Sequence, residues 1–127
     1  KITVANVFNK IPTFIGYGTD SVETVTADGA LSATKAVSIL AASGTTTVQT
    51  TLADVTQVGF TKHIIRAGTS SGAHDVDLTT SVGSVATITF DGAGSTVSLM
   101  WSGTAGWVVL ASGTGSTGAN DNGITIS

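Results

Sequence analysis

Residues 85–101 read VATITFDGAGSTVSLMW, and this stretch decides the fold class. Two runs rich in β-branched residues flank Asp91-Gly92, a dipeptide typical of a tight turn between two strands. In the second run the apolar residues Val97, Leu99 and Trp101 alternate with the residues between them, so one face of that strand is predicted to lie in a core. Together with residues 107–112, the stretch predicts a meander of three strands.

The rest of the chain continues this pattern. From about residue 20 onward β-branched residues dominate, and turn dipeptides recur about every 8 to 12 residues, as in an all-β sandwich or barrel. No segment has a convincing helical period. We therefore expect an all-β domain, an antiparallel β-sandwich or barrel of jelly-roll type. The expected strands cover residues 21–26, 35–41, 46–52, 59–66, 75–80, 85–90, 96–102 and 107–112.

Two segments flank the β-domain, which we place at residues 20–112. Residues 1–19 hold the only proline and the only tyrosine of the chain, and Pro12 prevents an interior helix or a central strand there. We expect an extended arm that docks on another chain through large apolar side chains; the alternative is an edge strand on its own domain. The expected docking residues are Phe8, Ile11, Phe14, Ile15 and Tyr17. Residues 113–127 are a glycine-rich tail, either a mobile tip or a strand that pairs with a neighbour through residues 124–126.

The composition excludes several classes of protein. Only 10% of the 127 residues are charged, against about 25% in an ordinary soluble domain, so other subunits are expected to cover much of the surface. The net charge of −3 argues against a nucleic-acid partner, which would need a basic face. No apolar run approaches the length of a membrane span, and no secretory signal is visible. Because there is no cysteine, disulfides and thiolate chemistry are excluded.

Two matches to enzyme motifs lack the context that those motifs need. Residues 113–118 fit GxGxxG, but only nine residues follow, too few for the helix, strand and acidic residue of a dinucleotide site. Residues 68–72 fit GxSxG, but no helix follows the serine, as a nucleophile elbow requires. The sequence therefore predicts no catalytic residue, no cofactor and no enzymatic activity.

The histidines and tryptophans are the remaining candidates for a site. His63, His74, Asp75 and Asp77 are the only grouping that suggests a cation site. No third close ligand follows residues 74–77, so we predict solvated carboxylates and no metal. His63 lies in the most apolar strand and is expected to be a hydrogen-bonded interior or interface residue. Trp101 and Trp107 flank a tight loop; we expect a core residue and a subunit contact, and the alternative is a pair of rings that stack on glycan.

Six segments, taken in order and spacing, resemble a small β-domain of structural proteins of tailed phages, especially marine ones. The segments are residues 23–31, 51–54, 62–65, 86–91, 97–101 and 106–110. The chain departs from the family pattern at residues 54–60, where a leucine-alanine-aspartate-glycine turn and a glutamate-glycine-glutamine run are usual.

The resemblance implies a virion protein with threefold symmetry. Such domains are homotrimeric modules of capsid decoration or cement proteins and of head or tail fibres. Because the chain has a short arm and no long stalk, we expect a decoration protein that binds the major capsid protein on the shell surface, after synthesis in the host cytoplasm. The alternative is a head- or tail-fibre module that binds host surface glycan through Trp101, Trp107 and the loop at residues 67–74.

Overall fold

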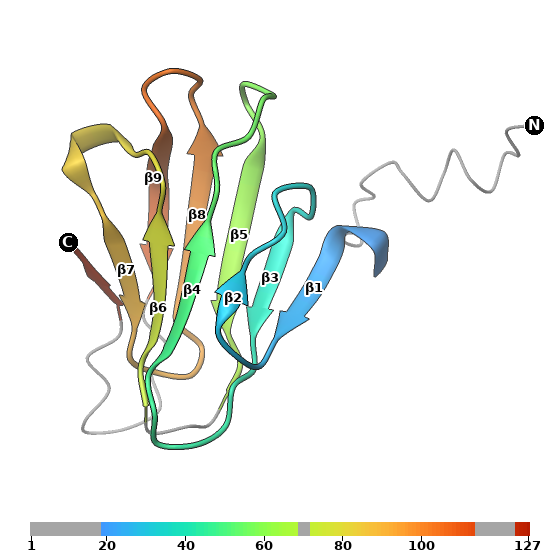
Figure 1. Ribbon diagram of the computed structural model, residues 1–127, viewed down its shortest axis with the longest axis vertical. Coiled ribbons are helices and arrows are strands. Elements are labelled where there is room, and N and C mark those ends of the chain that lie inside the picture. Colours follow the sequence, from blue (N-terminus) through green and yellow to red (C-terminus); the bar gives the residue numbers. More distant parts are fainter. Residues whose placement is uncertain (1–18, 69–71, 114–123) are drawn as a thin grey trace, which may run out of the picture.

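The computed structural model describes residues 19–68, 72–113 and 124–127. These residues form two five-stranded sheets that pack face to face (Figure 1), so the expected β-sandwich is confirmed. Sheet 1 contains, in spatial order, β1 (Val22–Val25), β3 (Val37–Leu40), β5 (Thr61–Arg66), β8 (Thr96–Trp101) and β9 (Trp107–Gly113). Sheet 2 contains β10 (Ile124–Ile126), β7 (Thr87–Phe90), β6 (His74–Leu78), β4 (Val48–Leu52) and β2 (Gly29–Ala30).

Two short 3-10 turns complete the described elements. They are η1 (Thr19–Ser21), just before β1, and η2 (Val82–Ser84), between β6 and β7. Within the described ranges there is no helix long and apolar enough to cross a membrane.

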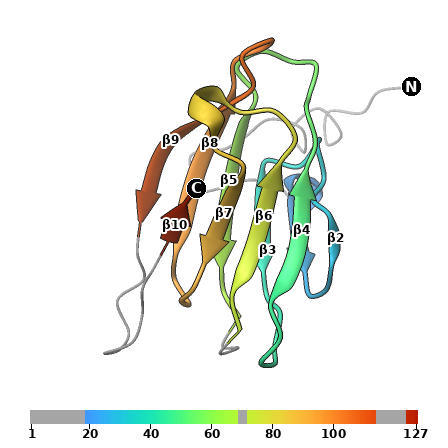
Figure 2. The ribbon, with the colours of Figure 1, turned by 60° about the vertical axis from the view of Figure 1, so that its left-hand side comes forward.

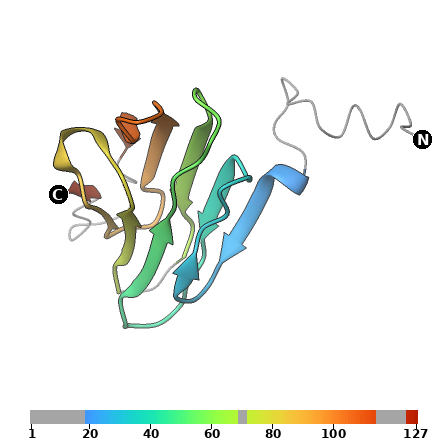
Figure 3. The same cartoon turned by 45° about the horizontal axis from the view of Figure 1, so that its top comes forward.

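The chain alternates between the two sheets over its first six strands. As a result β1, β3 and β5 run parallel to one another in sheet 1, and β2, β4 and β6 run parallel in sheet 2 (Figure 3). This half of the sandwich winds like a short solenoid, in which each coil gives one strand to each sheet. Both sheets are therefore mixed rather than wholly antiparallel, because a strand that returns to its sheet after a crossover keeps its direction.

The expected meander over residues 85–112 is wrong in one of its links. β8 and β9 form an antiparallel pair, but β7 lies in sheet 2, where it pairs with β6 and β10. The chain thus crosses from one sheet to the other at Asp91-Gly92, and no hairpin forms there. The reason is that β5 already occupies the place beside β8.

The core lies between the sheets and follows the alternation seen in the sequence. Val97, Leu99 and Trp101 are all buried, as predicted, and Trp107 is completely buried beside Trp101. The two indole rings meet edge to face with centroids 5.4 Å apart, an arrangement worth about 0.5–1.5 kcal/mol beyond area burial. Further buried residues include Leu40, Ile64, Leu52, Val76, Ile88 and Phe90.

Successive coils approach closely at the corner where β3 leads to β4 and β5 leads to β6. A Cβ atom on Gly68 would lie 2.3 Å from the carbonyl oxygen of Ala42, and one on Gly72 would lie 2.5 Å from that of Thr46. The two outer glycines of the GxSxG match are therefore needed for backbone packing. Residues 69–71, with the serine of that match, lie outside the described residues.

The end of the chain belongs to the sandwich. β10 pairs antiparallel with β7 of its own chain, and Ser127 N donates to Thr87 O at 3.0 Å. The tail expected from residue 113 thus begins inside β9 and finishes as an edge strand of sheet 2. Residues 1–18 of the expected arm and most of the GxGxxG match lie outside the described residues, whereas Thr19, the last residue of that arm, begins η1.

Candidate interaction surface

The two outer faces of the sandwich differ in charge. Alternation along β1, β3, β5, β8 and β9 places apolar and hydroxyl side chains on the outer face of sheet 1. In these described strands the outward positions hold no lysine, arginine, aspartate or glutamate. The outward residues are Val22, Thr24, Val37, Ile39, Thr61, His63, Ile65, Thr96, Ser98, Met100, Val108 and Ala111.

A hollow of about 330 Å³ lies in the middle of this outer face. Val37 of β3, His63 and Ile65 of β5, and Thr96 and Ser98 of β8 line it. His63 Nδ1 and Ser98 Oγ lie 2.9 Å apart and form a hydrogen bond across two neighbouring strands. His63 is therefore hydrogen-bonded, as expected, but it lies on an outer face and not in the interior. The hollow suits an apolar side chain, because its polar groups include a pair that already satisfy each other.

The outer face of sheet 2 is polar and acidic. Asp75 and Asp77 of β6 point outward, and each carboxylate accepts a hydrogen bond from a neighbouring strand. Gln49 Nε2 donates to Asp75 Oδ2 at 2.7 Å, and Thr87 Oγ1 donates to Asp77 Oδ1 at 2.7 Å. The other oxygen of Asp75, Oδ1, is buried and has no hydrogen-bond partner among the described residues. The outer face of sheet 1, by contrast, exposes apolar side chains.

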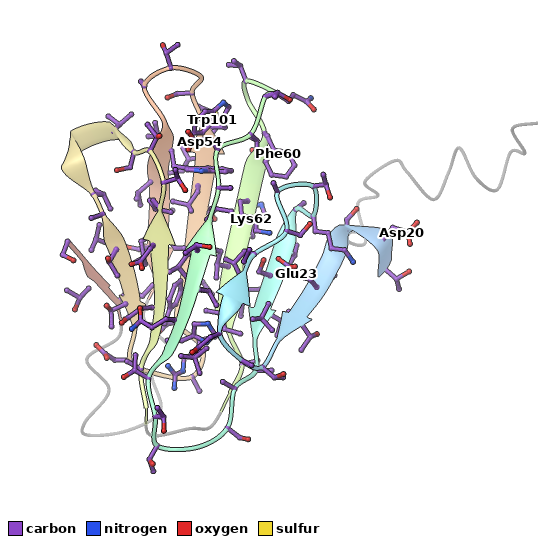
Figure 4. All side chains as sticks on the ribbon, viewed as in Figure 1. Asp20, Glu23, Asp54, Phe60, Lys62 and Trp101 are labelled. Atoms are coloured by element: carbon purple, nitrogen blue, oxygen red, sulfur yellow. The ribbon has the colours of Figure 1, made fainter. Side chains whose placement is uncertain are left out.

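A buried ion pair links the first coil of the sandwich, β1 and β2, to the third, β5 and β6 (Figure 4). Lys62 Nζ, completely buried on the inner face of β5, lies 3.0 Å from Glu23 Oε1 of β1. Lys62 Nζ also donates to Ser32 O at 2.8 Å and to Lys35 O at 2.9 Å, so all three of its protons are used. Glu23 accepts further bonds from Ser38 Oγ and from Ser32 N.

These contacts shift the pKa values of both groups. Burial would raise the pKa of Glu23, but hydrogen bonds from Ser38, Lys62 and Ser32 outweigh it and hold the pKa below its usual value. Burial lowers the pKa of Lys62 although Glu23 opposes this effect.

The ion pair between Glu23 and Lys62 was not predicted from the sequence. The available signal was that Lys62 and Arg66 share a strand face with Ile64, which a buried strand uses for its core.

Arg66, the last residue of β5, and His74, the first residue of β6, lie in the interior of the third coil. Arg66, 2% exposed, donates to Phe90 O and Gly72 O. His74 is 1% exposed on the inner face of β6, and neither of its ring nitrogens has a hydrogen-bond partner among the described residues. Burial, and secondarily the Arg66 guanidinium, lower the pKa of His74.

The residues of β6 that were considered as a cation site lie on two different faces of that strand. His74 points into the core, whereas Asp75 and Asp77 point outward. Over residues 19–68, 72–113 and 124–127, no group of three or more His, Cys, Asp or Glu side chains could hold a metal ion.

The two tryptophans proposed from the sequence as contact residues lie among the described residues, and the docking residues of the arm do not. Trp101 is 6% exposed and Trp107 is 0% exposed, and Trp107 Nε1 donates to Ala53 O at 3.2 Å. Neither ring presents a free face to a sugar, so the glycan alternative would need other residues. The docking residues expected in the arm lie outside the described residues.

Comparisons with known proteins do not assign the chain to a family. A scan of protein-family models finds no match to the chain, and a search of curated proteins finds no significant match either.

Proposed function

We propose that this chain is a structural protein of a tailed-phage virion, a homotrimeric decoration protein that binds the assembled head shell and stabilises it. One observation carries the proposal: the outer face of sheet 1 has no charged side chain at its outward positions and mixes apolar with hydroxyl residues, whereas the opposite face is polar and acidic. A β-sandwich with one such uncharged face fits a subunit that is buried against other proteins. The resemblance of six segments to phage structural domains supplies the virion and the threefold symmetry.

Such a protein works by binding and not by catalysis. A trimer that contacts several capsid subunits binds the intact shell but not its separated parts, and so it stabilises the shell by linkage. Three arms in one trimer add avidity, because the second and third contacts form within one complex. The proposed docking residues are the apolar side chains of the arm, and the proposed partner is the major capsid protein.

The proposal is tested by co-sedimentation with empty heads of the phage that encodes the chain, prepared without this protein. We expect the full chain to pellet with the heads. Replacing Phe8, Phe14 and Tyr17 by alanine should abolish pelleting, because each lost aromatic anchor costs about 2 kcal/mol or more in every arm.

The matched control replaces Thr3, Asn6 and Asn9 by alanine in an arm of the same length, and it should bind like the unchanged chain. Light scattering shows whether the variants remain trimers. If the variant with alanine at Phe8, Phe14 and Tyr17 still binds heads, the arm does not dock on the shell. If the full chain never pellets with heads, the proposed decoration function is wrong.

A further inference from the structure

We propose that copies of this chain contact one another through the outer face of sheet 1, and that Leu110 of one copy enters the hollow between β3, β5 and β8 of the next. From the proposed function the inference takes only that the chain forms a trimer. It adds the surface through which the copies meet and the residues that fit together.

Charge selects sheet 1 as the contact between copies. Two copies that met through the outer faces of sheet 2 would bring Asp75 and Asp77 of both chains together with no lysine or arginine from the described strands of that sheet. Like charges in contact repel each other and disfavour such an interface. The outer face of sheet 1 has no formal charge at its outward positions, so two patches of this face from neighbouring copies can meet without repulsion.

Leu110 supplies an apolar side chain of the right kind at the edge of the same sheet. It is 52% exposed, and it is the extra residue of a β-bulge, because Val109 pairs with Leu99 and Ala111 with Ser98. β9 is an edge strand of sheet 1 (Figure 2). Edge strands usually carry charges or proline that prevent pairing with other chains. Residues 107–113 contain neither, which favours a partner along this edge.

The hollow and Leu110 are different patches of one sheet, with β8 between β5 and β9. If two copies exchange Leu110 reciprocally, the contact is isologous and gives a twofold dimer. If each copy gives Leu110 to one neighbour and receives Leu110 from another, the contact is heterologous and closes into a ring. The proposed trimer requires this second, one-way contact.

Disulfide trapping tests the contact directly, because the natural chain has no cysteine. The full chain would carry Ile65→Cys together with Leu110→Cys. β5 and β9 are two strand spacings apart, about 9.6 Å, beyond the roughly 7 Å that a disulfide spans between Cα atoms. A bond between these positions therefore joins two copies. We expect linked dimers and trimers on a non-reducing gel after mild oxidation.

Two controls define the contact further. A mixture of the Ile65→Cys and Leu110→Cys single variants should give linked dimers with one chain of each kind. A pair of cysteines on the outer face of sheet 2, Thr51→Cys with Thr89→Cys, should give no linked species. Linked dimers from Leu110→Cys alone, in a yield equal to that of the mixture, would show a contact of β9 with itself and would overturn the proposal.

Light scattering of charged variants gives a second, independent test. Leu110→Asp or Ile65→Asp should reduce the mass to that of a single chain, whereas Thr89→Asp on the other outer face should leave the trimer intact. Circular dichroism confirms that each variant is folded. A trimer that persists in both Leu110→Asp and Ile65→Asp would overturn this contact and leave the decoration function standing. A natural chain that is a monomer at all concentrations would overturn the contact and the proposed trimer together, whereas loss of head binding by a trimer would count against the function alone.

Discussion

Glu23 of the first coil and Lys62 of the third form an ion pair inside the sandwich, and their hydrogen-bond partners explain why the two charges are tolerated there. Lys62 Nζ donates to the Glu23 carboxylate and to two backbone carbonyls, those of Ser32 and Lys35. The loop between β2 and β3 is thereby tied to β1 and β5. Such a pair adds little net stability compared with apolar residues of the same size, but breaking it leaves an uncompensated buried charge.

Lys62→Met should therefore be strongly destabilising. We expect a loss of about 3–5 kcal/mol in the free energy of unfolding, because the Glu23 carboxylate loses its charged partner and the carbonyls of Ser32 and Lys35 lose a donor. The measurement is urea unfolding followed by tryptophan fluorescence. Lys35→Met is the matched control; its Nζ donates to Val22 O at a partly buried site, and its loss should cost about 1 kcal/mol or less. The double variant Glu23→Leu with Lys62→Met should recover part of the loss. Equal effects of Lys62→Met and Lys35→Met would contradict this account.

At the scale of elements, the positions of strands were predictable and their directions were not. Alternating β-branched residues located β1 and β3 to β9 to within about two residues at each end, because alternation is a local property of a half-buried strand. β2, only two residues long, was missed. Strand direction depends on whether each turn returns to the same sheet or crosses to the other. Asp91-Gly92 serves a crossover as readily as a hairpin, so the local sequence does not distinguish the two.

The uncharged outer face of sheet 1 could not be predicted from the sequence for a related reason. Apolar residues occupy both faces of the strand expected over residues 59–66, a pattern typical of a strand that is buried on both sides. In the structure the inner face holds Lys62, Ile64 and Arg66, and Ile65 is outside and 36% exposed. Which face of β5 is covered follows from the neighbouring coils, and no pattern within the strand encodes it.

Close packing of the loops at the corner between successive coils predicts that alanine substitutions at Gly72 and Gly44 destabilise the protein for different reasons. Gly72→Ala should destabilise the protein by about 1–3 kcal/mol, because the new Cβ would lie 2.5 Å from Thr46 O and overpack a backbone contact. Gly44→Ala is the comparison: it has φ +130 but no atom within 4 Å of the added Cβ, so it measures backbone strain alone. Thermal unfolding of both variants separates the two causes. A Gly72→Ala variant as stable as the natural chain would show that the corner loops can move apart.

The whole molecule should have a pH-dependent stability governed by His74. Its ring is buried beside Arg66 without a hydrogen-bond partner among the described residues, so its pKa in the fold is below the ordinary 6.5. The folded state therefore prefers the neutral imidazole. The stability linked to this preference is fully present above pH 6.5 and is lost as the pH falls through the lowered pKa, because the unfolded chain binds the proton first.

Urea unfolding between pH 8 and pH 4.5 measures this linkage. The natural chain should lose stability steadily below about pH 6.5, at up to about 1.4 kcal/mol for each pH unit. His74→Leu removes the titrating group, and its stability should change much less over this interval. Below pH 4.5 both proteins should lose further stability, because the pKa of Glu23 in the fold is lowered from 4.5 and its protonation breaks the pair with Lys62. If His74→Leu followed the same slope as the natural chain between pH 6.5 and pH 5, another group would have to carry the effect, and the buried neutral imidazole would not be the source of acid sensitivity.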